Sequence, residues 1–430
     1  MRVVPIATWG LRLREVFRGT TTTAYRIPTI SHLTSLIALE RTMWIRPWLV
    51  LGAAAAAVGG LAVPAGASAG VSAESRTPVV VVSHLNNPRQ LTFAPGGSLL
   101  IAEAGRGARH PDASRCSNGP EGQTCIGATG SITRIEHPWS ASHVAPDRVV
   151  TGLLSGGAAD GGQATGSDGV AYQNGAILVQ MTYAPPAAIP AGLPAWQLGH
   201  LLRVVGSHKR LDGNISRIEF EQNPDGLQVD TNPYSVVTVD GTTSISADAA
   251  GNDLIRVHDG ASRLLTVLPL HGCGGVRTQR CDRESVPTSL TKGPDGRIYV
   301  GELAHFEPQV ARVWRVSPTS GALLGYYGRG GTLCPGTGGF TTITGVAFGP
   351  DGSLYVSELI GGPDGSGDVV KISRSCHRSS VAVPLPGGVV VGSRGNVYVS
   401  AFSISDADGA AGPDPSAPPL PPGQVWRLRF

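Results

Sequence analysis

One short pattern recurs along this chain and constrains its fold more than any other feature. Residues 346–358 read as an apolar run, a Gly-Pro-Asp-Gly turn and a second run of alternating strand formers that ends in glutamate. The same order recurs in residues 290–302 and, more loosely, in residues 91–103. Strand formers on both sides of a glycine-rich turn predict a β-hairpin. A hairpin that repeats along the chain predicts a repeat architecture.

Six hairpins can be aligned, and each is followed by a third strand of a common type. The turn glycines that anchor them are Gly97, Gly175, Gly241, Gly296, Gly352 and Gly395. The third strands are expected at residues 130–135, 200–205, 254–257, 313–316, 369–372 and 425–428. A fourth strand is visible after some of them. We therefore predict an all-β fold, a six-bladed β-propeller of four-stranded blades. A β-sandwich of similar composition would not repeat the turn in register.

The two ends of this repeat region each carry a strand without a local partner. Residues 78–85 form an expected strand before the first hairpin, and residues 423–430 form another with nothing after it. An unpaired strand edge needs a partner. We expect these strands to pair, so that the first strand becomes the outer edge of the last blade and closes the ring.

The first 69 residues are typical of a targeting segment rather than of a folded domain. A charged start at Met43, an apolar stretch and a small-residue site ending at Ala69 predict a signal peptide over residues 43–69. The apolar stretch is short for a membrane anchor. Residues 1–42 then read as an upstream extension with a mis-assigned start. We expect an exported mature protein, residues 70–430, that is one propeller domain, has no membrane span and is a monomer.

The charge of the expected mature chain bears on its partners. Residues 1–69 hold seven arginines and two glutamates, so removing their excess of five positive charges turns the formal net charge of +3 into −2. Nucleic acid is therefore not an expected partner, because its phosphates require a basic surface.

All six cysteines lie in the expected mature chain, and an even number in an exported protein favours disulfides. Short spacings predict the pairs Cys116–Cys125 and Cys273–Cys281, and the pair Cys334–Cys376 follows by elimination. Zinc sites usually show closer cysteine pairs, so we do not expect metal ligation by these residues.

Long insertions separate the second and third strands of most blades, and all of them would emerge on one face of a propeller. They are expected at residues 104–129, 181–199, 305–311, 360–367 and 402–422. Long loops on a rigid scaffold are where binding usually resides.

Residues 79–430 resemble the ScyD/ScyE family of exported bacterial proteins. The resemblance is carried by Asn87-Pro88-Arg89, by Ala102-Glu103-Ala104-Gly105, and by the segments 127–132, 223–234 and 301–316. The family looks like a relative of NHL-type propellers, so the resemblance implies the same fold. It implies no catalytic residues, because no catalytic set is established for the family.

Simple strand alternation selects four polar side chains that would point toward the propeller axis: Gln90, Asp168, Ser235 and Ser289. We treat them as candidate binding residues. Oxygen ligands of this kind suit Ca²⁺, but only one of the four is a carboxylate. We therefore expect no resident metal or cofactor, with Ca²⁺ held by Asp168 and Gln90 as the alternative.

Four acids end the second strands of their blades, namely Glu103, Asp248, Glu302 and Glu358. A metal ring is one interpretation. The position of these acids just before a connecting loop favours another, in which each carboxylate accepts loop backbone N–H groups.

Two functions from different classes fit these observations. The first is a binding module that takes a small molecule, a glycan or a protein on its loop-rich face. The alternative is a propeller lactonase, hydrolase or lyase with a divalent metal in the central channel. For that alternative the candidate catalytic residues are His110, His271, His305 and Arg109, because such chemistry needs a base and a cation in one pocket.

Overall fold

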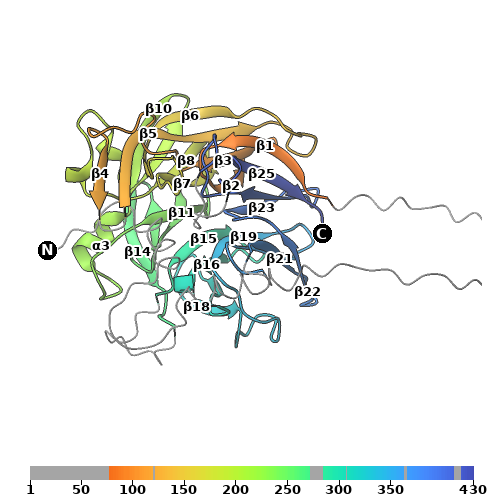
Figure 1. The fold of residues 1–430 in the computed structure, drawn as a ribbon. Coiled ribbons are helices and arrows are strands. Elements are labelled where there is room, and N and C mark those ends of the chain that lie inside the picture. Colours follow the sequence, from red (N-terminus) through yellow and green to blue (C-terminus); the bar gives the residue numbers. More distant parts are fainter. Residues whose placement is uncertain (1–76, 120–121, 272–283, 307, 363–365, 411–417) are drawn as a thin grey trace, which may run out of the picture. The chain divides into compact units, whose positions relative to one another are not determined.

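The computed structural model describes residues 77–430, except for residues 120–121, 272–283, 307, 363–365 and 411–417. The expected upstream extension and signal peptide lie outside the described residues. Within this part the chain forms six antiparallel sheets, five of four strands and one of five (Figure 1). The six-bladed propeller predicted from the repeats is confirmed.

The first three blades follow the chain in order. Blade 1 consists of β2 (Pro88–Phe93), β3 (Leu99–Glu103), β5 (Gly122–Ile135) and β6 (Asp147–Gly157), with the extra strand β4 (Cys116–Gly119). Blade 2 consists of β7 (Ser167–Gln173), β8 (Ala176–Met181), β9 (His200–Val205) and β10 (His208–Asn214). Blade 3 consists of β11 (Pro233–Thr238), β12 (Thr243–Asp248), β13 (Asp253–His258) and β14 (Ala261–Val267).

The last three blades repeat the same order. Blade 4 consists of β15 (Pro287–Lys292), β16 (Ile298–Glu302), β17 (Val313–Val316) and β18 (Leu323–Tyr327). Blade 5 consists of β19 (Ile343–Phe348), β20 (Leu354–Glu358), β21 (Asp368–Ile372) and β22 (Arg378–Ala382). Blade 6 consists of β23 (Val389–Val391), β24 (Val397–Ala401), β25 (Gly423–Leu428) and β1 (Val79–Leu85).

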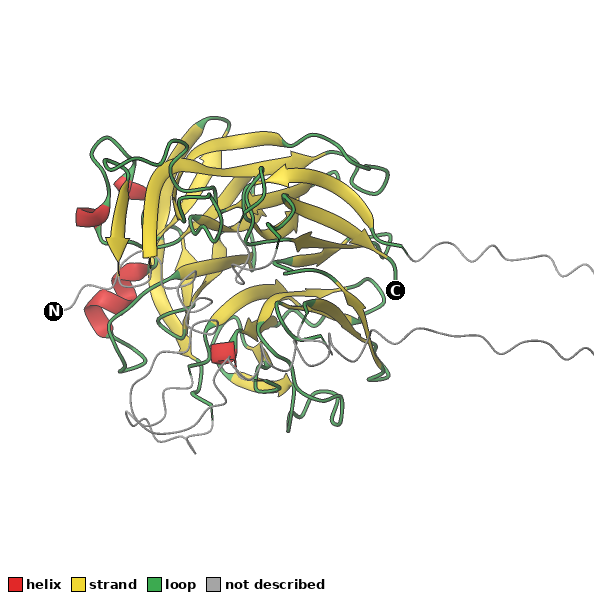
Figure 2. Ribbon diagram, viewed as in Figure 1, coloured by secondary structure: helices red, strands yellow, loops and turns green. Residues whose placement is uncertain are grey.

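Helices are few, as Figure 2 shows. Among the described residues the α-helix is α3 (Ser216–Gln222), accompanied by the 3₁₀ turns η1 (Pro186–Ala188), η2 (Ala195–Gln197) and η3 (Ala304–Phe306). No helix in this part of the chain has the length and hydropathy to cross a membrane.

The hairpin turns explain why the pattern repeats. In blade 5 the Gly352 amide donates to the Gly349 carbonyl at 2.9 Å, and the Asp351 carboxylate accepts the Ser353 amide at 3.0 Å. Gly352 has φ +75°, a conformation that glycine adopts at little cost. Four of the other five anchor glycines also have positive φ, and Gly241 does not.

The ring closes as predicted. Strand β1 pairs antiparallel with β25, with Val80 opposite Trp426 and Val82 opposite Val425, and in Figure 1 the first strand lies beside the last. The register shifts between Val80 and Val82, which marks a β-bulge. As a result Val81 and Val82 are both fully buried, whereas regular alternation would have buried only one of them.

Each junction between neighbouring blades has its own hydrophobic cluster. Separate groups of buried residues lie between blades 1 and 2, 2 and 3, 3 and 4, 4 and 5, and 5 and 6. The cluster at the closing junction joins Val81, Val82 and Val425 of blade 6 to Leu91 and Leu99 of blade 1. The core is therefore a ring of six junctions, and its closure depends on β1.

Two of the predicted disulfides are present. Cys116–Cys125 joins β4 to β5, so the long insertion of blade 1 contains a small stapled hairpin rather than a loop alone. Cys334–Cys376 joins the connection between blades 4 and 5 to the turn after β21. The predicted pair Cys273–Cys281 lies outside the described residues.

Candidate functional site

The innermost strands share an irregularity where each begins, at the loop-rich face. In β7, β11, β15 and β19 the register shifts by one residue after the first position. The residues at these bulges are Asp168, Tyr234, Thr288 and Thr344. In β2 the shift spans Arg89 and Gln90. A bulge redirects a side chain, and this repeated one turns polar groups toward the axis.

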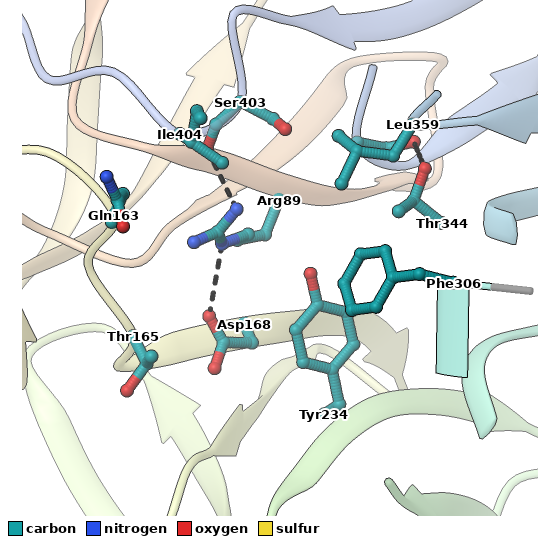
Figure 3. A pocket seen from close by; sticks show the side chains of 11 residues that line it. Arg89, Gln163, Thr165, Asp168, Tyr234, Phe306, Thr344, Leu359, Ser403 and Ile404 are labelled. Atoms are coloured by element: carbon teal, nitrogen blue, oxygen red, sulfur yellow. Dashed lines mark hydrogen bonds and ion pairs between the residues drawn. The ribbon is translucent and has the colours of Figure 1, made fainter. Parts of the chain in front are cut away.

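These side chains surround a small cavity at the axis, shown in Figure 3. It is lined by Arg89, Gln163, Thr165, Asp168, Tyr234, Phe306, Thr344, Leu359, Gly387, Ser403 and Ile404. Its volume is about 20 Å³, which is enough for a water molecule. The lining comes from the inner strands and from the loops above them, so the cavity lies just beneath the loop-rich face.

Arg89 and Asp168 face each other in this cavity (Figure 3). The Arg89 Nε lies 3.5 Å from Asp168 Oδ1, while its Nη1 donates to the Ser403 carbonyl at 2.9 Å and its Nη2 to the Ala164 carbonyl. Burial raises the pKa of Asp168 to about 6, against the opposing charge of Arg89. Burial also raises the pKa of Tyr234 to about 12. Tyr234 is thus a neutral hydrogen-bonding group near neutral pH, and Asp168 can exchange a proton under mildly acidic conditions.

Gln90 extends across the axis below the cavity. Its Nε2 donates to the Thr288 carbonyl of blade 4 at 3.0 Å and to the Thr344 carbonyl of blade 5 at 2.8 Å. From blade 6, Gly388 approaches so closely that a Cβ there would lie 2.7 Å from the Gln90 Cα. Gln90 therefore ties blades 1, 4 and 5 together across the centre of the ring.

The four side chains selected by simple alternation occupy different environments. Asp168 lines the cavity and Gln90 lies beside it, but Ser235 and Ser289 are buried one position beyond the bulge and do not line it. A Cβ at Gly301 would lie 2.5 Å from the Ser289 hydroxyl, so Ser289 is directed toward β16. Alternation overlooked Arg89 and Tyr234 because it does not account for bulges. The signal that could have identified them is the proline at the start of an inner strand, because the residue that follows it, such as Arg89 after Pro88 or Tyr234 after Pro233, lies at the bulge.

The arrangement at the axis does not favour a bound cation. Asp168 faces the Arg89 guanidinium group, which occupies the one carboxylate at the axis, and Gln90 donates through its Nε2 to two backbone carbonyls. Across the described residues, no three His, Cys, Asp or Glu side chains are arranged as a metal site would require.

The acids that end the second strands accept backbone N–H groups, as predicted. Glu103 accepts the Asn86 amide at 2.7 Å, Asp248 the Asn232 amide at 2.7 Å, and Glu302 the Arg312 amide at 3.2 Å. Glu358 accepts the Thr341 amide. The contact recurs because the same strand end meets a loop in each of these blades.

The candidate catalytic residues do not form one site. His271 is buried, with its Nε2 2.9 Å from Glu302 Oε2 in blade 4. His110 and Arg109 lie in the insertion of blade 1, and the side chain of His305 is outside the described part of the structure. A catalytic site built from all of these residues has no support in the geometry.

Arg109 and His110 instead line a second pocket, of about 500 Å³, between the insertions of blades 1 and 2. Its walls are Ala108, Arg109, His110, Asp112, Arg115, Ile126, Gly127, Ala128, Thr129 and Leu193. The Cys116–Cys125 bridge holds the insertion of blade 1 beside this pocket. We refer to it as the blade 1 pocket.

The blade 1 pocket carries two arginines whose guanidinium groups are not hydrogen-bonded to the described part of the protein. Arg109 and Arg115 form no hydrogen bond or ion pair through their guanidinium groups, and Arg115 Nη1 is buried. In contrast, nearby Arg106 is paired with Asp406 and Asp408. Asp112 accepts the amide and hydroxyl of Ser114, and these hydrogen bonds, together with the charge of Arg115, lower its pKa. The pocket therefore offers cationic donors beside the apolar side chains of Ile126 and Leu193.

Comparison with known proteins assigns no activity. No protein-family model matches the chain, and no curated protein matches it. Solved structures that are similar include a streptogramin B lyase, with 12% identity, a TM-score of 0.41, and coverage of 82% of this chain and 96% of that one. A glucose dehydrogenase has 12% identity, a TM-score of 0.41, and coverage of 82% and 99%. The WD40 β-propeller domain of Doa1 has 10% identity, a TM-score of 0.39, and coverage of 82% and 94%. At these identities and TM-scores the likeness gives no substrate or reaction.

Proposed function

We propose that the protein is an exported binding module that takes a small carboxylate-bearing molecule, such as an acidic sugar, in the blade 1 pocket on its loop-rich face. The observation that carries the proposal is the pair of guanidinium groups without hydrogen-bond partners, those of Arg109 and Arg115, in a hollow of about 500 Å³. That volume lies within the range of small-molecule sites.

The chemistry of the pocket suits a carboxylate on a partly apolar ring. A guanidinium group binds a carboxylate through two parallel hydrogen bonds, which gives both strength and orientation. Ile126 and Leu193 would contact the C–H face of a sugar ring. The Thr129 hydroxyl at the edge supports the pocket wall, because it donates to the Gly107 carbonyl and accepts the Arg106 amide. The axial cavity is far smaller, and its two charged groups, Arg89 and Asp168, form an ion pair with each other, so it is the weaker candidate for ligand binding.

Calorimetric titration with matched sugars tests this proposal. The panel pairs galacturonate with galactose, glucuronate with glucose, and each is measured at low and high salt. We expect at least one acid to bind more tightly than its neutral counterpart, and Arg109→Gln/Arg115→Gln to weaken that binding by about tenfold or more, or about 1.4 kcal/mol. Arg134→Gln is the matched control, because Arg134 is an exposed arginine paired with Glu136 on another part of blade 1. Equal binding of acid and neutral sugar in every pair would refute the proposal.

Export is the second part of the proposal. The two disulfides and the signal-like pattern of residues 43–69 support it, and the motifs shared with the ScyD/ScyE family support membership in that family. We expect a monomeric mature chain that begins at Gly70. Intact-mass analysis of the culture supernatant tests this, and a secreted species that retains residues before Met43 would contradict both the start site and the cleavage site.

A metal-dependent hydrolase or lyase with its site at the axis is less well supported. It would need a free carboxylate there, and Asp168 faces Arg89.

A further inference from the structure

Another pocket of about 500 Å³ lies at the junction of blades 1 and 6, among the hairpin turns. These turns join the two innermost strands of their blades, at the strand ends away from the long insertions, so the pocket opens on the opposite face from the blade 1 pocket. Its lining includes Phe93, Gly97, Trp139, Gly392, Arg394 and Tyr398. We call it the turn-face pocket.

Aromatic rings form much of the wall of the turn-face pocket. The rings of Phe93 and Tyr398 meet edge to face, with their centroids 5.7 Å apart, and Trp139 is half-buried beside them. Two glycines leave room at these rings. A Cβ at Gly97 would lie 3.3 Å from the Trp139 ring, and one at Gly392 would lie 3.3 Å from the Phe93 ring. A hollow of this volume with aromatic walls suits a small molecule that has a flat ring.

The hairpin turn of blade 6 departs from the repeat in its charge. In blades 4 and 5 the third residue of the Gly-Pro-Asp-Gly turn is an aspartate that pairs with a cation of the third strand. Asp295 Oδ2 lies 2.7 Å from Arg315 Nε, and Asp351 Oδ2 lies 3.5 Å from Lys371 Nζ. In blade 6 the same turn reads Gly-Ser-Arg-Gly, with Arg394 in place of the aspartate. The turn that borders the pocket is therefore cationic rather than acidic.

The third strand of blade 6 keeps its cation, so two arginines meet at this junction. Arg427 on β25 donates through Nη1 to the Pro138 carbonyl at 2.9 Å and to the Trp139 carbonyl. Arg394 has no hydrogen bond or ion pair with the described residues, and its guanidinium carbon lies 4.4 Å from the centroid of the Trp139 ring. A guanidinium group that stacks on an indole keeps its in-plane N–H donors available. Arg394 is thus held by the ring with its donors unused.

We propose that the turn-face pocket binds a small aromatic carboxylate. Arg394 supplies the charge of the pocket lining, so the pocket favours an anion over a neutral or cationic molecule. Its guanidinium group would bind the carboxylate through two parallel hydrogen bonds, while the ring of the ligand packs against the exposed parts of Phe93 and Trp139. An inorganic anion would use the arginine but leave the aromatic walls without contact. This site is independent of the function proposed for the blade 1 pocket.

Calorimetric titration of the folded chain with three matched probes tests the site. The probes are phenylacetate, phenylacetamide, which has nearly the same shape without the charge, and cyclohexylacetate, which keeps the charge without the aromatic ring. We expect phenylacetate to bind with a Kd of about 1 mM or tighter. It should bind at least about tenfold more tightly than either of the other probes, and more weakly at high salt. No detectable binding of phenylacetate, or equal binding of all three probes, overturns the proposal.

Two variants assign the site. Arg394→Asp should fold, because blades 4 and 5 carry aspartate at this position of the turn, and it should weaken phenylacetate binding by about tenfold or more. Arg374→Gln is the matched control and should leave binding unchanged, because Arg374 is exposed in a turn of blade 5 and does not line the pocket. Equal binding by these two variants contradicts the assignment. Loss of phenylacetate binding in Arg109→Gln/Arg115→Gln, with binding retained in Arg394→Asp, would place the probe in the blade 1 pocket and overturn the proposal.

Discussion

Replacing Val81 and Val82 by alanine will measure how much of the stability of this protein depends on closing the ring. Both side chains are fully buried, and they lie in the cluster that joins blade 6 to blade 1. Each substitution removes two methyl groups, worth about 0.8 kcal/mol apiece in transfer alone, and leaves a cavity whose cost adds to this. We expect a total loss of about 4–6 kcal/mol. The net stability of a folded protein is on the order of 5–15 kcal/mol.

The matched control is Val79→Ala/Val80→Ala, in the same strand and with the same change in volume. These two side chains are only partly buried, so we expect about half the effect or less. Urea unfolding followed by tryptophan fluorescence is the assay, since Trp426 lies opposite Val80 on β25. With a slope of about 3 kcal/mol per molar urea, the buried pair should lower the midpoint by about 1–2 M.

Two outcomes would refute the reasoning. If neither pair moves the midpoint, β1 does not close the ring and its pairing with β25 contributes little. If both pairs move it equally, the bulge between Val80 and Val82 does not decide which side chains support the core.

Three further predictions address other parts of the fold. Gln90→Ala should lower the free energy of unfolding by about 1–3 kcal/mol in urea unfolding, because two buried carbonyls lose their donor; an unchanged midpoint would contradict this. The raised pKa of Asp168, about 6, means that the folded state favours its protonated form. Wild-type stability should therefore fall relative to Asp168→Asn, by up to about 3 kcal/mol, as the pH rises from about 4 through 6; parallel pH profiles would exclude this. Replacing Cys334 and Cys376 by serine, at a separation of 42 residues, should cost about 3–4 kcal/mol, and more than loss of the nine-residue bridge in blade 1. Equal midpoints for the two serine variants would show that loop length is not the controlling factor.

Much of the fold could be predicted because it follows from local chemistry. A turn such as the one at Gly352 needs a residue with positive φ, and strand formers on both sides pair across it whatever the rest of the chain does. The exception, Gly241, still ends a hairpin but without positive φ. The closure of the ring could also be predicted. The strands at the two ends of the repeat region each lack a local partner, and pairing them with each other satisfies both strand edges.

The candidate sites were harder to predict, because they depend on small departures from regular geometry. The bulge at Tyr234 shifts the side chain that faces the axis by one residue, which is why Ser235 lies outside the cavity. The stapled hairpin in blade 1 places Arg115 in the same pocket as Leu193 of blade 2. Neither the bulge nor the position of the stapled hairpin produces a periodic pattern in the amino-acid sequence.

The sequence by itself determined the number of blades, the order of strands within each blade and the way in which the ring closes, because hairpin turns and strand alternation act between near neighbours. Only the tertiary structure decided which charges meet. Arg89 of blade 1 faces Asp168 of blade 2, and the charge of Glu219, on a helix that precedes blade 3, raises the pKa of Asp253. Such encounters depend on how neighbouring sheets pack and on where their strands bulge. Burial then strengthens the electrostatic interaction between charged groups that are far apart in the sequence.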